Sequence, residues 1–155
     1  MIVFDSNTWA DFFNGAPTAH VQRLDDALRD EEDLAVLPII ITEVRQGSRT
    51  EAGVHRARGI LEALPAIQPT VDCHVRAVLL FRFLRRKGGT VRGAIDCIIA
   101  QACLDIDAEL LSPDVDFRRI ARHAGLRAWG KESGDPRVRT GVIRVTMTLV
   151  RPSDR

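Results

Sequence analysis

The chain has 155 residues, of which 45% are hydrophobic and 28% are charged, which suits a single globular domain with a proper core. Its net charge of +1 excludes a polycation. No apolar run approaches the ~20 residues of a membrane span, and the N-terminus lacks the basic region of a signal peptide, so we expect a cytoplasmic protein. Because Cys73, Cys97 and Cys103 form no CxxC pair, we expect reduced, buried thiols and neither a disulfide framework nor a zinc site.

The first half of the chain alternates short apolar runs, typical of buried parallel strands, with helical patterns. We expect strands at 1–4 and 34–37 and helices at 6–13, 21–28 and 38–47. Ser6 or Asn7 is the expected N-cap of the first helix, and Pro38 suits the first turn of the third. The third helix carries Glu43.

The second half continues the alternation. We expect helices at 51–64, 71–86, 95–106 and 117–121 and strands at 66–68, 108–112 and 126–129. Strands alternating with helices predict an α/β fold, a three-layer α/β/α domain with a mainly parallel sheet over residues 1–129. Residues 130–155 read as a linker followed by an alternating apolar pattern, which fits an edge strand, a strand that pairs with a partner, or a poorly ordered extension.

Five carboxylates fall where a parallel sheet places its functional site. Asp5 follows the first strand, Glu43 lies on the helix after the second, Asp96 begins a later helix, and Asp114 and Asp116 follow the next strand. Sites in open α/β sheets form outside the carboxyl ends of the strands, so these acids converge if their strands are neighbours. Each acid alone also suits a turn, a helix cap or a solvated helix position, so the hypothesis rests on their combination.

The acids together predict a metal site. Crowded carboxylates raise one another's pKa unless a cation neutralises them, and hard oxygen ligands suit Mg²⁺ or Mn²⁺. Such an ion can polarise a phosphodiester and lower the pKa of a bound water, while a carboxylate not committed to the metal orients the water. Arg82, Arg85, Arg86 and Arg92 lie in a stretch without acids, which suits binding of a phosphate backbone and equally suits a solvated helix face.

Four segments of the chain resemble the PIN-domain ribonucleases, and most closely the VapC-type toxins of bacterial toxin–antitoxin pairs. They are MIVFDSNTW at the N-terminus, ITEVRQG in the middle, TVRGAIDCIIAQAC, and LLSPDVDFRRIA. The segments occur in the order and spacing of the family, and the resemblance covers residues 1–129.

The resemblance implies a role for each acid. Asp5 is similar to the family's metal ligand after the first strand, Glu43 to the helix acid of the middle motif, and Asp96 to the metal-binding acid at a helix start. Asp114 resembles the acid of the final motif, and Asp116 resembles the frequent extra acid beside it.

The resemblance also implies the fold, the cofactor and the partners. Asn7 occupies the place of a small hydroxyl residue or Asn that contacts the site. The implied fold is a parallel sheet in the order 3-2-1-4-5 with helices on both faces. The implied protein is a homodimer that needs Mg²⁺ or Mn²⁺ and cleaves structured RNA such as tRNA or rRNA. A cognate, VapB-like antitoxin wraps such a toxin and can push a basic side chain into the acidic pocket.

Other enzymes that use an acid after the first strand fit less well. A phosphatase of the haloacid dehalogenase type needs a second acid two residues further on, where this chain has Asn7. A two-component receiver domain needs paired acids after the first strand and a phosphoacceptor after the third, and neither is visible. Two alternatives to the toxin remain open, a housekeeping RNA-processing nuclease of the same fold and a degenerate domain that only binds RNA or a partner protein.

Overall fold

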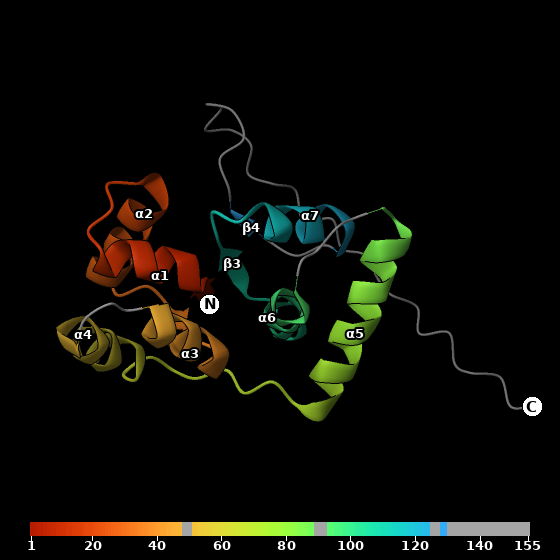
Figure 1. Cartoon of the computed structure of the whole chain (residues 1–155), viewed down its shortest axis with the longest axis horizontal. Coiled ribbons are helices and arrows are strands. Elements are labelled where there is room, and N and C mark those ends of the chain that lie inside the picture. The colour runs from red at the N-terminus through yellow and green to blue at the C-terminus, as the bar shows by residue number, and fades with distance from the viewer. Residues whose placement is uncertain (48–50, 89–92, 125–127, 130–155) are drawn as a thin grey trace, which may run out of the picture.

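Four short strands form the centre of the computed structural model, which describes residues 1–47, 51–88, 93–124 and 128–129 (Figure 1). All of their pairings are parallel, and the strands lie in the order β2-β1-β3-β4. Their bounds are Ile2–Phe4 for β1, Leu34–Ala35 for β2, Glu109–Leu111 for β3 and Ala128–Trp129 for β4. Because β1 lies between β2 and β3, the carboxyl ends of these strands share one edge of the sheet.

One expected strand is missing from this sheet. The segment 66–68 contributes a single parallel bridge between Ala66 and Val36, made by the Val36 N–H to the Pro65 carbonyl and the Ile67 N–H to the Val36 carbonyl. Proline has no N–H for a strand ladder, and prolines flank this segment on both sides, so pairing stops after one bridge. The five-strand order 3-2-1-4-5 therefore stays a prediction, and the alternating segment in 130–155 lies outside the described residues.

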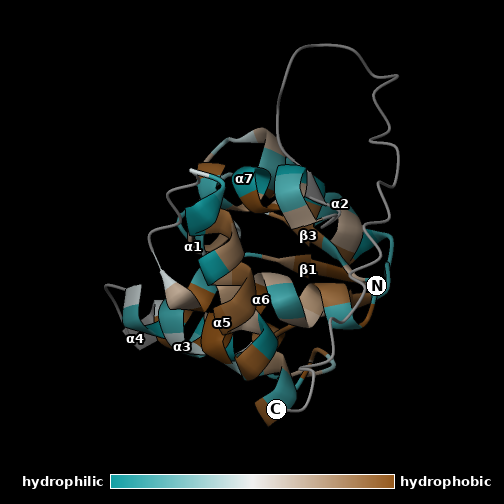
Figure 2. Ribbon diagram, turned by 90° about the vertical axis from the view of Figure 1, so that its right-hand side faces the viewer, coloured by the Kyte–Doolittle hydropathy of each residue, from teal (hydrophilic) through white to brown (hydrophobic). Residues whose placement is uncertain are grey.

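Helices cover both faces of the sheet, so the predicted three-layer arrangement is confirmed (Figure 1). The helices are α1 Ser6–Phe13, α2 Ala19–Arg29, α3 Pro38–Gly47, α4 Glu51–Leu61, α5 Val71–Arg86, α6 Ala94–Asp105 and α7 Val115–Ala124. Strands β1 and β3 are hydrophobic, whereas α7 turns a hydrophilic side outward (Figure 2). No helix in the described part of the chain combines the length and the apolar character needed to cross a bilayer.

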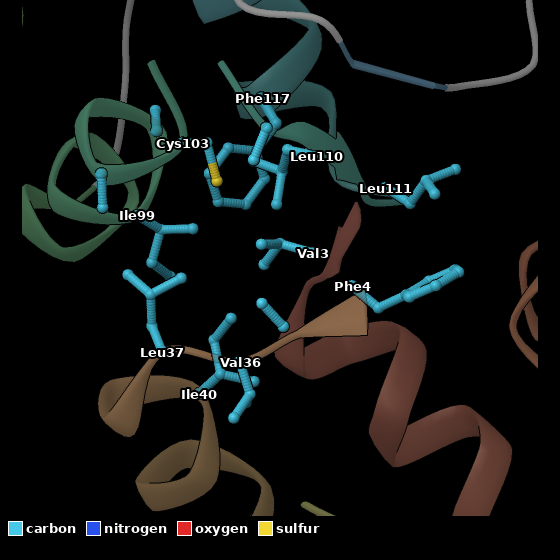
Figure 3. Packing of buried hydrophobic residues seen from close by; sticks show 14 of the residues in the cluster. Val3, Phe4, Val36, Leu37, Ile40, Ile99, Cys103, Leu110, Leu111 and Phe117 are labelled. Carbon is cyan, nitrogen blue, oxygen red and sulfur yellow. The ribbon is translucent and has the colours of Figure 1, made fainter. Parts of the chain in front are cut away.

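The side chains of the central strands alternate between the two faces of the sheet. Val3 and Leu110 point toward α6, whereas Phe4 and Leu111 point the opposite way (Figure 3). On that opposite side the ring of Trp9 in α1 meets the Phe4 ring edge-on, with centroids 6.3 Å apart. All five side chains are buried, and burying each one stabilises the fold by roughly 1.5–3 kcal/mol. This packing on both faces fixes where the strand ends, and the acids after them, are placed.

Helices α5 and α6 form an antiparallel pair. Arg76, near the start of α5, makes an ion pair of 2.7 Å with Asp105 at the end of α6. The C-terminal turn of α5, with Arg85 and Arg86, therefore lies at the end of the pair where α6 begins and Asp96 is located. The pairing brings a basic helix end and an acidic helix start to the same end of the molecule.

Two local predictions can be compared with the structure. Helix α1 begins at Ser6 with Asp5 as its N-cap, so the prediction that Ser6 or Asn7 caps this helix is wrong. The Asp5 carboxylate makes no capping bond to the helix, because it accepts hydrogen bonds from neighbouring side chains instead. The three cysteines are buried and free, as predicted.

Candidate metal centre

Asp5 is a buried carboxylate at the carboxyl end of the central strand, with 2% of the residue exposed. Its N–H donates to the Leu111 carbonyl at 3.0 Å, which continues the pairing of β1 with β3 by one residue. Three side chains donate to its carboxylate, Ser112 Oγ at 2.8 Å and Ser6 Oγ and Asn7 Nδ2 at 3.2 Å each. Burial raises the pKa of Asp5 above its usual value, although these hydrogen bonds act in the opposite direction.

The turn between β3 and α7 is joined to Asp5 by a chain of hydrogen bonds. Ser112 Oγ, which donates to Asp5, accepts from the N–H of Asp114 at 3.0 Å. Asp114 Oδ1 in turn accepts from the N–H of Asp116 at 2.8 Å. Ser112 is 3% exposed, so its hydroxyl is committed to these two partners. Sequence reasoning missed Ser112, because it placed this residue within the strand 108–112, whereas β3 ends at Leu111.

Asp96 is a carboxyl group whose pKa is raised by burial and by the neighbouring acids. It lies in the first turn of α6 and is partly buried. Its pKa is raised from 3.8 to about 6, first by burial and then by the negative charges of Asp114, Asp5, Asp116 and Glu43. Charges act in this way only over short distances, so the fold brings the five predicted acids around one place.

Glu43 and Asn7 approach this place from two further helices. Glu43 lies partly buried on α3, the helix after β2, and its charge adds to the rise in the pKa of Asp96. Asn7 lies in the first turn of α1 with its side chain exposed, and its amide donates to Asp5. Both residues therefore border the acidic group, as a water-orienting acid and a substrate-contacting amide would.

The acidic group suits a hard divalent cation that keeps part of its water shell. Within the described ranges, no three acidic, histidine or cysteine side chains lie close enough together to hold an ion as a ready-made cage. Mg²⁺ usually retains several waters and is bound through one or two carboxylates, so acids that lie near each other without touching fit it. The negative neighbours of Asp96 raise its pKa, and a bound cation would relieve that repulsion.

Asp116 already has a positive partner. Its Oδ1 lies 2.8 Å from Nη1 of Arg119, one turn further along α7. The Asp116 side chain is 2% exposed and the Arg119 side chain is 42% exposed, so the guanidinium runs from a buried carboxylate toward solvent. Sequence reasoning missed Arg119, because an arginine three residues after an acid on a helix is an ordinary surface pattern.

The predicted phosphate-binding arginines gather at one end of α5. Arg82, Arg85 and Arg86 are exposed there, and none of them pairs with a carboxylate in the part of the chain that the structure describes. The guanidinium of Arg85 lies 5.8 Å from the centre of the Phe81 ring. The fourth predicted residue, Arg92, lies outside the described residues.

Comparisons with known proteins agree on one family and fold. The family model described as the PIN domain matches residues 2–123 of this chain. The VapC ribonuclease Mb1587 of Mycobacterium bovis and the ribonuclease VapC11 of Mycobacterium tuberculosis are each 27% identical to it over 130 residues. These alignments cover 83% of this chain and 97% of each relative.

Solved structures with a similar chain include two VapBC proteins. One is VapBC2 from Rickettsia felis bound to a DNA fragment from their promoter, with a TM-score of 0.66 at 21% identity. Another is VapBC-1 from nontypeable Haemophilus influenzae, with a TM-score of 0.64 at 20% identity. In both cases 84% of this chain and 98% of the other chain are covered. At these identities the likeness shows a shared fold.

Proposed function

Because the chain belongs to the PIN domain family, we propose that it is a metal-dependent endoribonuclease, the toxin of a type II, VapBC-like toxin–antitoxin system. The observation that carries the proposal is the gathering of four other acids around Asp96, whose pKa they raise. Relatives named as VapC ribonucleases support the ribonuclease activity. Structured RNA, such as tRNA, is the proposed substrate.

Asp5, Asp96, Asp114 and Asp116 are the residues proposed to hold Mg²⁺ or Mn²⁺. Asp5 follows β1, Asp96 lies at the start of α6, and Asp114 and Asp116 lie just before and within the first turn of α7. All four offer carboxylate oxygens, the donors that these ions prefer. When bound, such an ion supplies Lewis acidity toward a phosphodiester and lowers the pKa of a water molecule. Glu43 is the carboxylate proposed to orient the attacking water and accept its proton.

Four arginines and Asn7 are the proposed RNA contacts. Arg82, Arg85, Arg86 and Arg92 are assigned to the phosphate backbone, and the first three are exposed at the end of α5 that adjoins the start of α6. Such contacts give affinity that does not depend on sequence and that falls as salt rises. Asn7, exposed at the start of α1, is proposed to contact the nucleotide at the site.

A VapB-like antitoxin is the proposed protein partner. Solved structures with a similar chain include VapBC2 and VapBC-1, which supports this class of partner. A basic side chain from the partner would relieve the repulsion around Asp96 by the same electrostatics as a metal ion. Inhibition by the antitoxin and binding of the metal would then compete for one charge-compensating position.

We also propose a homodimer, with the outer face of α5 at the contact between two copies. Val71, Val75, Val78 and Leu79 recur at helical spacing on the side of α5 opposite its buried residues, and they are 49–83% exposed. An exposed apolar stripe of this kind marks an interaction surface. A two-fold contact would bury the same stripe on both subunits.

Sequencing of RNA ends after brief expression tests the proposed activity. Wild type is compared with Asp96→Asn, which keeps the size of the side chain and removes its charge. We expect new cleavage ends in structured RNA with wild type and their loss with the variant. Purified wild type should cut the same positions with Mg²⁺ and leave them intact with a chelator. Equal end patterns for wild type and variant would remove the nuclease proposal.

A further inference from the structure

Asp116 and Arg119 form an ion pair within the acidic group. The carboxylate is nearly inaccessible to solvent, whereas the guanidinium, 2.8 Å away, reaches the surface. A buried carboxylate needs a counter-charge or several hydrogen-bond donors, because it has lost its hydration. Arg119 supplies that counter-charge from within the same helix, α7.

The pair stands at one end of a continuous run of contacts that reaches the central strand. Arg119 holds Asp116, whose N–H donates to the carboxylate of Asp114 at 2.8 Å. The N–H of Asp114 donates to Ser112 Oγ, which donates to Asp5. Three of the four proposed metal-binding acids therefore belong to one hydrogen-bonded unit. A shift of Asp116 would change the first turn of α7 and with it the direction of the Asp114 carboxylate.

We propose that Arg119 is a positioning residue of the metal centre, which acts by holding the buried Asp116 carboxylate and thereby fixes the turn that presents Asp114. The inference rests on the proposed function, because it assigns a role toward the proposed metal. Arg119 itself touches neither metal nor substrate in this assignment. Residues that orient metal ligands typically change metal affinity by about 10–100-fold when they are removed.

The burial of Asp116 separates this role from that of an ordinary surface ion pair. Arg58 on α4 and Glu62 just after it make a comparable contact of 2.9 Å, but both side chains are well exposed. Exposed pairs of this kind contribute little to stability. The Arg58 pair is therefore the matched control, since it has the same chemistry without a buried acid and lies on a helix outside the acidic group.

The test measures Mn²⁺ affinity of the full chain by the loss of the free Mn²⁺ signal in electron paramagnetic resonance. Wild type, Arg119→Met, Arg119→Lys and Arg58→Met are compared, with circular dichroism to show that each is folded. We expect binding by Arg119→Met to be weaker by about tenfold, binding by Arg119→Lys to be within a few-fold of wild type, and binding by Arg58→Met to be unchanged. Unchanged affinity in Arg119→Met would overturn the inference.

A double-mutant cycle with Asp116→Asn tests whether Arg119 acts through Asp116. If it does, adding Arg119→Met to Asp116→Asn should change Mn²⁺ affinity by less than about twofold, because the charge that the arginine holds is already gone. An equal loss in both backgrounds would refute action through Asp116. Failure of the proposed function looks different, since wild type itself would then bind no Mn²⁺ or Asp96→Asn would bind it as tightly as wild type.

Discussion

Removing the charge of Asp96 is expected to stabilise the metal-free protein. Burial and the neighbouring acids raise the pKa of Asp96 from 3.8 to about 6, a difference of about two, which corresponds to about 3 kcal/mol at about 1.4 kcal/mol per pKa unit. Asp96 is only partly buried, so screening by solvent reduces this to about 1–2 kcal/mol. Asp96→Asn should therefore raise the melting temperature without metal by about 2–8 °C for a chain of this length.

The sign of the pH dependence follows from the direction of the pKa change. A carboxyl group whose pKa is higher in the folded state binds its proton more tightly there, so its stabilising contribution is complete below about pH 4. That contribution is lost as the pH rises through about 6. Wild type without metal should therefore lose stability between pH 4 and 8 relative to Asp96→Asn, and the two proteins should differ most at pH 8.

Thermal unfolding followed by circular dichroism, with EDTA and at several pH values, measures this difference. Asp105→Asn is the matched control on the same helix. Burial acts to raise the pKa of Asp105, but hydrogen bonds from Arg76 and Gln101 lower it below its usual value. Removing the Asp105 charge should therefore destabilise the protein at pH 8. Added Mg²⁺ should stabilise wild type and leave Asp96→Asn nearly unchanged. An Asp96→Asn protein no more stable than wild type at pH 8 in EDTA would refute the reasoning.

Three further predictions concern other parts of the molecule. Ser112→Ala removes a buried hydrogen-bond donor to the Asp5 carboxylate, so it should lower the free energy of unfolding in urea by about 1.5–3 kcal/mol and weaken Mn²⁺ binding about tenfold. If neither quantity changed, the proposed hydrogen-bonded unit would be wrong. Val78→Glu should convert a dimer to a monomer in sedimentation while metal affinity is kept, and a persistent dimer would move the contact elsewhere. Replacing Arg82, Arg85 and Arg86 together by Ala should reduce the salt slope of single-stranded RNA binding by about 2, and an unchanged slope would exclude these arginines as phosphate contacts.

The sequence was informative wherever one local pattern determines one element. Residues 1–4 and 108–112 were read as strands, and the structure has parallel strands at Ile2–Phe4 and Glu109–Leu111. The four motif segments were sufficient to place the chain in the PIN family, which the family model confirms. The acids were also found this way, because Asp5 and Asp114 each follow a strand directly or within a few residues.

The sequence was less informative about contacts that depend on several elements at once. Ser112 acquires its role because its hydroxyl lies within 2.8 Å of Asp5, a residue 107 positions away in the chain. Arg119 has its proposed role because its partner Asp116 is buried, and burial depends on packing that no local pattern encodes. The possible strand at 66–68 makes a single bridge, because the prolines on both sides of it limit the pairing.

The acidic group and the sheet register depend on each other. Phe4 pairs with Leu111, and this register alone puts Asp5 beside Ser112 and the turn that carries Asp114. A slip of one residue would turn Phe4 from the Trp9 side to the opposite face of the sheet, so packing of the aromatic core resists any change in the position of the acids. The free energy of core packing thus offsets the repulsion between the carboxylates. A bound cation would reduce that repulsion.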